Sequence, residues 1–131
     1  MTQRRRAWSA SPWESQYGYC RAIRAGAHIY VTGTAPVSDD GGVFAPGDPS
    51  AQATRCFEII GKALAELGAS PADLVRTRMF VTDIQHADAF GRAHKAFVGA
   101  HAPATTMVEV SALIDPRMLI EVEADAVVGE A

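Results

Sequence analysis

Apolar residues recur along the chain with two different periods, and the change from one period to the other marks the expected elements. Alternation at every second position predicts four strands, over residues 28–32, 74–82, 105–112 and 120–128. Apolar positions at three- and four-residue steps predict helices over residues 48–67 and 87–98. Scattered apolar residues favour a further strand at 17–23, and a short edge strand is expected at 43–44. The main elements therefore follow the order strand, strand, helix, strand, helix, strand, strand.

The first helix carries a signal at each end. Asp48 is suited to accept hydrogen bonds from the free amides of the first turn, and Pro49 fits the first helical position. Gly68 is placed to end the helix in the left-handed conformation. These signals make it the best-defined element of the chain.

The alternating strands place different residues on the two faces of the expected sheet. Two helices cover only one face of such a sheet, which makes the expected fold class α+β. The other face is expected to carry Arg78, Phe80, Met107 and Glu121, a mixture of apolar and charged side chains. An uncovered face of this kind indicates a partner, most simply another copy of the chain.

Length and charge limit the possible functions. The 131 residues suit one domain, expected over residues 13–131 after an irregular segment at 1–12. The net charge of −3 and the pI near 5.7 argue against a nucleic-acid partner, because phosphate binding needs a concentrated positive field. The one basic run, at residues 4–6, is interpreted as a solvated tail, and a weak anchor for an anionic partner is the alternative.

The cysteines and the apolar runs bear on location. Cys20 and Cys56 form no CxxC pair, and two thiols of this kind indicate a reducing compartment. The first arginines are not followed by the apolar run of a signal peptide. No stretch approaches the about 20 apolar residues of a membrane span. We therefore expect a cytoplasmic protein without a membrane partner.

Motifs for metals and common cofactors are absent from the sequence. The four histidines, His28, His86, His94 and His101, match no metal-ligand spacing. The sequence has no P-loop, no GxSxG elbow and no GxGxxG fingerprint. Cys20 as a nucleophile is an alternative, although cysteine often serves only as a small buried apolar residue. We expect no metal and no cofactor, so the chemistry has to come from side chains, backbone groups and water.

Four ordered segments resemble one known family. They are Tyr19 followed by IYVTGTAP at 29–36, RTRMFVTD at 76–83, PATTMVEV at 103–110 and LIEVEA at 119–124. Their residues and spacing are similar to those of the reactive-intermediate deaminase family, also called Rid or YjgF-like. The resemblance covers residues 17–128, nearly the whole chain.

The resemblance implies a fold, an assembly and an activity. The fold is like that of bacterial chorismate mutase, and three copies pack their sheet faces into a homotrimer with ligand clefts between subunits. The characterised activity of the family is hydrolysis of reactive enamines and imines, which releases ammonia and a carbonyl product. The implied partners are a small-molecule ligand and further copies of the chain.

The resemblance also assigns site residues. Tyr19 matches the family's active-site tyrosine, and Glu121 matches the carboxylate that orients or activates water. Thr32 and Gly33 match hydroxyl and backbone groups that line the cleft, and Met107 matches a side chain of its wall. Structural alternatives exist for each, such as an ion pair for Glu121 or an interface contact for Tyr19.

Thr105 departs from the family pattern, because deaminating members have an arginine there that pairs with the substrate carboxylate. A threonine hydroxyl has no charge and cannot form a bidentate pair. Arg78, on the same strand face as Phe80, is a candidate replacement, and an ion pair with Glu123 or Asp125 is the alternative. The candidate substrate-binding set therefore also includes Arg78, Phe80 and Thr105.

Two functions fit these observations. The first is an imine or enamine deaminase whose specificity differs from that for 2-imino acids. The second is a non-catalytic binder that uses the same cleft for a small metabolite, and the missing arginine favours it. A ribonuclease, which is also a label in the family, is disfavoured by the acidic pI and by the lack of a basic and aromatic stripe.

Overall fold

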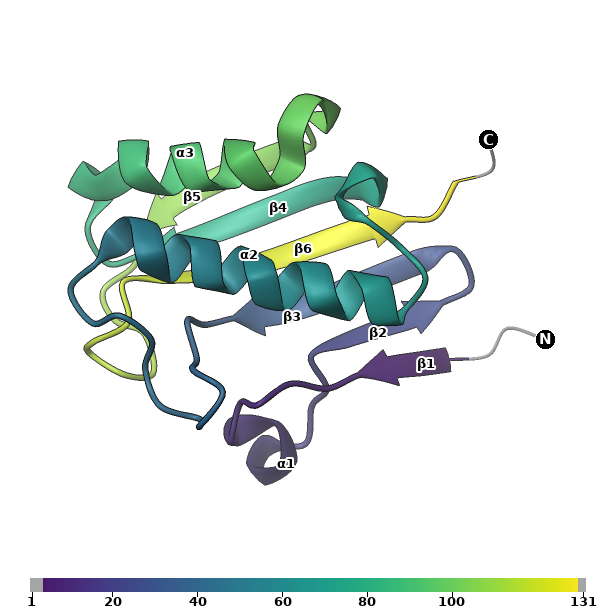
Figure 1. Cartoon of the computed structure of the whole chain (residues 1–131), viewed down its shortest axis with the longest axis horizontal. Helices are drawn as coiled ribbons and strands as arrows, with labels where there is room; N and C mark the ends of the chain where they lie inside the picture. Colours follow the sequence, from purple (N-terminus) through teal and green to yellow (C-terminus); the bar gives the residue numbers. More distant parts are fainter. Residues whose placement is uncertain (1–3, 130–131) are drawn as a thin grey trace.

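Six strands form one mixed sheet in the computed structural model, which describes residues 4–129 (Figure 1). Their order is β1-β2-β3-β6-β4-β5, and all neighbours are antiparallel except β4 and β5, which are parallel. The strands are β1 (Arg4–Ala7), β2 (Ala22–Ala25), β3 (His28–Thr34), β4 (Leu74–Val81), β5 (Ala104–Glu109) and β6 (Ile120–Val127). The α-helices are α1 (Trp13–Tyr17), α2 (Pro49–Glu66) and α3 (Ala87–Val98). The predicted α+β fold class is confirmed.

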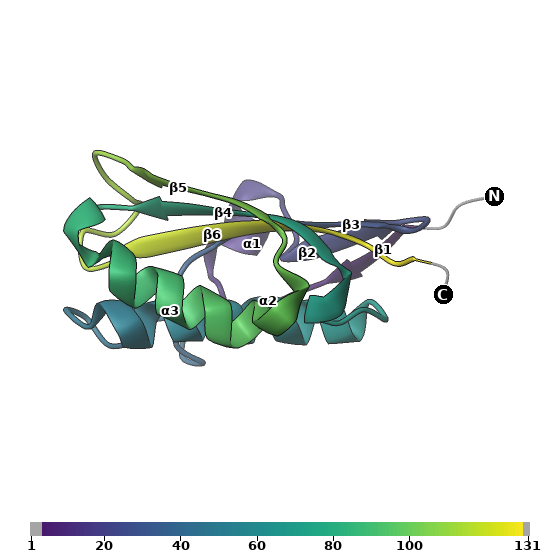
Figure 2. The ribbon, with the colours of Figure 1, turned by 90° about the horizontal axis from the view of Figure 1, so that it is seen from above.

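Helices α2 and α3 lie side by side on one face of the sheet, and neither crosses the opposite face (Figure 2). The apolar side of the strands meets them, so that Val81 of β4 and Val122 of β6 are fully buried. Between the helices, the rings of Phe57 and Phe97 stack with their centroids 5.1 Å apart. None of the helices described is long and apolar enough to cross a membrane.

Both ends of α2 have the caps that the sequence predicts. The Asp48 side chain accepts a hydrogen bond from the Ala51 amide at 3.0 Å, and Pro49 is the first helical residue. Beyond the last turn, Gly68 has a φ of +80°, the left-handed conformation that a side chain would strain. Local capping chemistry thus sets the length of this helix.

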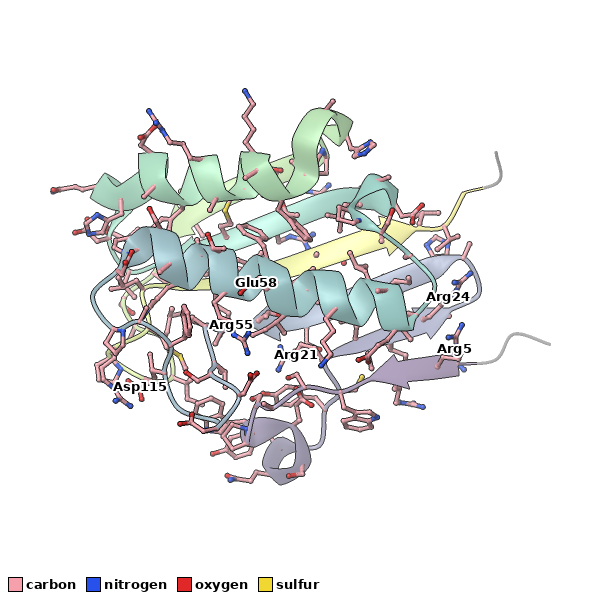
Figure 3. The ribbon with its side chains drawn as sticks, viewed as in Figure 1. Arg5, Arg21, Arg24, Arg55, Glu58 and Asp115 are labelled. Atoms are coloured by element: carbon pink, nitrogen blue, oxygen red, sulfur yellow. The ribbon has the colours of Figure 1, made fainter. Side chains whose placement is uncertain are left out.

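Two arginines of the sheet bind carbonyl groups at the C-terminal end of α2. Arg24 of β2 donates from Nη1 to the Leu67 carbonyl oxygen at 2.7 Å, and Arg5 of β1 donates from Nη2 to that of Glu66 at 3.0 Å. Figure 3 shows both side chains at this end of the helix. Positive charge complements the partial negative charge of a helix C-terminus, so these contacts join the sheet edge to the helical layer.

The N-terminal segment corrects one expectation. The sequence pattern predicts an irregular segment at residues 1–12, but Arg4–Ala7 form β1, antiparallel to β2. Ala7 is buried in the core, and Arg5 binds the end of α2, so the basic run is more than a solvated tail. Three consecutive exposed arginines show no alternation of apolar and polar residues, so the sequence gives no sign of a strand here. The strand forms because it pairs with the edge of β2. Residues 1–3 lie outside the described part.

The stretch at residues 17–23 does not form a single strand. Helix α1 ends at Tyr17, and Gly18 turns the chain with a φ of +77°. Strand β2 begins only at Ala22. Helix α1 is too short to show a clear helical period in the sequence. Apolar composition alone therefore predicts a strand that begins too early.

Two further strand predictions are shorter in the structure. In place of an edge strand at 43–44, a single bridge joins Val37 to Val43. Strand β5 ends at Glu109, so the alternation that continues to residue 112 belongs to a loop. Val43 pairs with Val37 across a short turn, and β4, the partner of β5, ends at Val81 opposite Glu109.

Met107 lies on the opposite face from the one that the sequence analysis assigns to it. The parallel register of β5 with β4 places Met107 beside Met79 and Val108 beside Phe80. Met79 is buried under the helices, and Met107 packs against the same core. The uncovered face therefore carries the exposed Val108 in place of Met107.

Replacing Arg24 with methionine should lower the free energy of unfolding by about 1–2 kcal/mol, because a partly buried carbonyl loses a charged donor. Chemical denaturation measures the change. The matched control is Arg92→Met on α3, whose ion pair with Asp88 is exposed, so its effect should stay within about 0.5 kcal/mol. Equal losses in the two variants would contradict a specific contact at the helix end.

Candidate functional site

A cavity of about 440 Å³ lies where α1, the end of β3, the start of β6 and the loop before β6 meet. Four of the predicted site residues line it, namely Tyr19, Thr32, Gly33 and Glu121. The other aromatic and charged residues of its wall are Trp13, Tyr17, Arg21 and Glu123. The structure thus brings together the residues from the first and last thirds of the chain.

Arg21, just before β2, is buried in the cavity wall with 3% of its side chain exposed, and Figure 3 shows it between α1 and α2 in that view. Its Nη2 lies 3.1 Å from Oε2 of Glu14, whose side chain is 4% exposed. Nη1 donates to the Gly33 carbonyl oxygen at 2.7 Å and to Thr34 Oγ1 at 3.1 Å, and Nε lies 3.2 Å from Ser9 Oγ. Every guanidinium nitrogen therefore has a partner within the chain.

Glu121 of β6 lies directly against Gly33 of β3. A Cβ atom added at Gly33 would lie 2.5 Å from Glu121 Oε2, so the carboxylate occupies the space that only glycine leaves. Burial raises the pKa of the Glu121 carboxyl, the Arg21 guanidinium opposes the rise, and Glu123 adds to it. Among residues 4–129, this carboxylate has neither a hydrogen bond nor an ion pair. A half-buried carboxylate of this kind is suited to accept a proton from water.

Tyr19 and Thr32 shape the wall beside Glu121. The Arg21 Cζ lies 5.7 Å from the centre of the Tyr19 ring, a cation–π contact that holds the ring in place. The Thr32 hydroxyl donates to the Cys20 carbonyl oxygen at 2.8 Å. The proton of that hydroxyl is therefore used within the chain, while its oxygen still has a lone pair for a ligand.

Arg78 and Phe80 are not part of this cavity wall. Arg78 Nη1 lies 3.6 Å from Glu123 Oε1 and 3.4 Å from Asp125 Oδ2, which is the ion-pair alternative of the sequence analysis. Phe80 pairs across the sheet with Glu121 and shares its uncovered face. The cation beside Glu121 is therefore Arg21 and not Arg78.

Thr105 and Met107 lie on the edge strand β5, outside the cavity of their own chain. Thr105 Oγ1 donates to the Pro103 carbonyl oxygen at 3.1 Å and lies 2.9 Å from Thr77 Oγ1. Thr77 Oγ1 in turn lies 2.7 Å from His94 Nε2. Burial lowers the pKa of His94, which favours a neutral imidazole at neutral pH. The network at this position is therefore uncharged.

Sequence reasoning misses Arg21, which lines the cavity, and Glu14, which is buried against it. The available signal is a charged residue between Cys20 and Ala22 in an apolar run, because a charge is buried only with a partner. No spacing rule connects Arg21 with Glu14, because Glu14 lies on the short helix α1 and Arg21 lies in the loop before β2.

Metal binding and cysteine chemistry have little support in the described part of the chain. No three His, Cys, Asp or Glu side chains gather there to hold a metal ion. Burial, with Glu121 nearby, raises the pKa of the Cys56 thiol, so it stays protonated and unreactive. Cys20 is half-buried and does not line the cavity.

Gly33→Ala should destabilise the wild-type protein by about 1–3 kcal/mol, because the new methyl group overlaps the Glu121 carboxylate. The same change in a Glu121→Ala background should cost less than about 0.5 kcal/mol, because the three atoms nearest that methyl group all belong to Glu121. Chemical denaturation of the four proteins gives the coupling energy. Additive effects would show that the two residues do not touch.

Stability should depend on pH through Glu121. The pKa of Glu121 in the folded protein lies above its usual value of 4.5. At a pH between the unfolded-state pKa and the folded-state pKa, the folded protein binds more protons than the unfolded one, so stability falls as pH rises. Glu121→Gln cannot ionise and should therefore be the more stable protein near about pH 7, an advantage that disappears near about pH 4. Thermal melting across this range checks the prediction, and an advantage that grows as pH falls would contradict it.

The chain is similar to a known protein family over most of its length. The model of the family Endoribonuclease L-PSP matches residues 10–128. The uncharacterized protein SCO2049 of Streptomyces coelicolor is 38% identical over 125 residues, which cover 95% of this chain and 92% of that protein. The RutC family protein PYRAB12510 of Pyrococcus abyssi is 35% identical over 109 residues, which cover 82% and 84%.

Solved structures share the fold. The crystal structure of Rv2704 from Mycobacterium tuberculosis, a member of the YjgF/YER057c/UK114 family, is 42% identical with a TM-score of 0.85, covering 95% of this chain and 99% of that one. The yeast protein YEO7, at 24% identity, has a TM-score of 0.85 over 95% and 98%, a likeness of fold alone. Together with the match over residues 10–128, these likenesses show that the chain belongs to the Endoribonuclease L-PSP family, the group also called Rid or YjgF-like.

Proposed function

We propose that this protein is a cytoplasmic hydrolase that deaminates a small imine or enamine and releases ammonia. The observation that carries the proposal is Glu121, a carboxylate of raised pKa without a partner in the part described, placed in a cavity of about 440 Å³. A carboxylate in this state serves as a general base for water. Tyr19, Thr32 and Gly33 line the same cavity and would orient the substrate or the water.

The reaction needs little beyond water and one proton acceptor. Glu121 takes a proton from water as the water oxygen attacks the carbon of the C=N bond, and it passes this proton to the nitrogen. The carbinolamine that results then loses its C–N bond: its hydroxyl proton moves to the nitrogen by way of Glu121, the oxygen becomes a carbonyl oxygen and the nitrogen leaves as ammonia. Atoms and electrons balance without an oxidant or a reductant.

The working site in this proposal is a cleft between copies of the chain in a homotrimer. The sheet face that α2 and α3 leave uncovered carries exposed Tyr30 and Val108 beside the ion-paired Arg78, a composition suited to self-association. Thr105, on the edge strand β5, would then approach the cavity of a neighbouring copy rather than its own, whereas Met107 packs against the core of its own chain. Arg78 and Phe80 would lie in the contact between copies.

Thr105 argues against a 2-imino acid as the substrate. An uncharged hydroxyl in place of an arginine would weaken the binding of a substrate carboxylate by about 1.5–3 kcal/mol. The Thr105 hydroxyl is, in addition, already bonded to the Pro103 carbonyl and close to Thr77. The same observation favours the second candidate function, a non-catalytic protein that binds a small metabolite in this cleft.

RNA cleavage, the activity in the family description, has little support from the charges. Seven described arginines bind carboxylates or carbonyl groups of their own chain, namely Arg5, Arg21, Arg24, Arg55, Arg78, Arg92 and Arg117. With a net charge of −3, the chain offers no concentrated positive field to a phosphate backbone. We therefore do not propose that it is a ribonuclease.

Ammonia release from freshly generated imines tests the proposal. The wild type should accelerate the hydrolysis of at least one imine without a carboxylate. Glu121→Gln should lower kcat/KM by about 10²-fold or more, because the general base is lost. Glu66→Gln, which removes an exposed carboxylate from α2, should keep the wild-type rate. Equal rates in Glu121→Gln and the wild type would remove Glu121 from the mechanism.

Thr105→Arg separates the two candidate functions in the same assay. An inactive wild type, with activity on 2-imino acids appearing only in Thr105→Arg, would favour the metabolite binder. An active wild type would favour the hydrolase, and the variant would then gain activity on substrates that carry a carboxylate. Light scattering of the wild type tests the assembly, and a monomer at micromolar concentration would contradict the cleft between copies.

A further inference from the structure

We infer that the ligand of the cavity is a cation without a carboxylate, namely a protonated imine attached to a small apolar or aromatic group. The inference rests on the proposed function, because it names the substrate class of the same cavity. Three features lead to it: each guanidinium nitrogen of the cavity arginine has a partner, one carboxylate has none among residues 4–129, and aromatic rings line the wall.

Arg21 is poorly placed to receive an anionic ligand, because its side chain is 3% exposed and each guanidinium nitrogen already has a partner within the chain. Its guanidinium binds Glu14, Ser9, Thr34 and the Gly33 carbonyl group. Because Arg21 and Glu14 are 3% and 4% exposed, their charges compensate each other inside the wall. An anion that took the place of Glu14 would leave that carboxylate buried without a partner, which is strongly unfavourable.

The charge that remains in the cavity is negative. Arg78 compensates Glu123 at 3.6 Å, but Glu121 has no comparable partner among residues 4–129. A substrate carboxylate beside Glu121 would meet a like charge that the Arg21 guanidinium only partly opposes, whereas a protonated nitrogen would offset the burial of that group. The cavity therefore selects against the carboxylate that every 2-imino acid carries.

Aromatic rings supply the other half of a cation site. Trp13, Tyr17 and Tyr19 line the cavity from α1 and the turn after it. Tyr19 already holds the Arg21 guanidinium, which leaves the rings of Trp13 and Tyr17, the latter 67% exposed. Aromatic faces attract cationic nitrogen groups. Ile114, exposed at the same cavity, offers an apolar surface to the rest of the ligand.

The same charge pattern suits the chemistry of an iminium ion. A proton on the nitrogen makes the C=N carbon more electrophilic, and water adds to it as Glu121 accepts a proton from the water. The carbinolamine then breaks its C–N bond and gives an aldehyde or ketone and an ammonium ion. One water is consumed, and nothing is oxidised or reduced.

Two imines that differ only in the carboxylate test the inference. An amine oxidase acting on 2-phenylethylamine supplies the imine without a carboxylate, and an amino-acid oxidase acting on phenylalanine supplies the matching 2-imino acid. Ammonia release above the uncatalysed rate should give a kcat/KM about tenfold or more higher for the first imine. Calorimetric titration with unreactive analogues should show the same order, with 2-phenylethylammonium bound about tenfold more tightly than 3-phenylpropanoate.

Two charge-removing variants locate the effect. Glu121→Gln keeps the shape of the side chain and should abolish the preference for 2-phenylethylammonium over 3-phenylpropanoate. Glu66→Gln is the control, because it removes an exposed carboxylate of α2 that does not line the cavity, and its affinity for the cation should change by less than about threefold. Thermal melting verifies that both variants are folded.

Calorimetric binding and ammonia release test the ligand class and the hydrolase activity separately. Binding of the cation without turnover would retain the ligand class and reject the hydrolase. Tighter binding or faster turnover of the carboxylate-bearing compound would overturn the ligand class and leave the hydrolase standing. Failure of both compounds to bind and to react would overturn the inference together with the proposed function.

Discussion

Arg21 and Glu14 form a salt bridge that has almost no exposure to water, and the cavity wall is held together through it. Burying two charges costs several kcal/mol per ion, and good geometry with further hydrogen bonds is needed to offset that cost. Glu14 accepts hydrogen bonds from the amide and the hydroxyl of Ser9, and Arg21 donates to Thr34 and the Gly33 carbonyl. One network therefore joins the N-terminal segment, α1 and the end of β3.

Beside this salt bridge, Glu121 has no ion pair of its own among residues 4–129. Arg21 is the cation whose charge opposes the effect of burial on Glu121, but each nitrogen of its guanidinium is already bonded to Glu14, Ser9, Thr34 or the Gly33 carbonyl. By binding that carbonyl, Arg21 also holds the backbone against which Glu121 lies. A half-buried carboxylate without a partner costs stability, and proteins retain such groups mainly where function requires them. This is why we place the chemistry on Glu121.

The sequence predicts those elements whose signals are local. The cap at Asp48, the turn at Gly68 and the period of α3 all arise within a few residues, and each is confirmed. Strand β1 depends on pairing with β2, and the side on which Met107 lies depends on its register with β4. These features arise from contacts between distant segments, so alternation along a single strand cannot determine them.

The candidate site divides in the same way. Tyr19, Gly33 and Glu121 are found from the resemblance, and the structure brings all three to one cavity. The salt bridge of Arg21 with Glu14 follows no periodic pattern, and it becomes visible only when α1 and the strand after it are in place. A charge pattern that decides ligand class was therefore beyond the reach of motif reasoning, although the residues that line the cavity were largely within it.

Charge balance, and not the kinds of residue in the wall, is what gives the cavity its preference. A cavity that contains an arginine is not an anion site when that arginine is already bonded to a buried carboxylate, as Arg21 is to Glu14. On the separate strand β5, Thr105 stands where the family resemblance leads us to expect an arginine, and the neutral His94 beside it supplies no charge. Two elements distant in sequence thus omit the same positive charge. Their agreement is the physical reason to expect a ligand that brings a positive charge of its own.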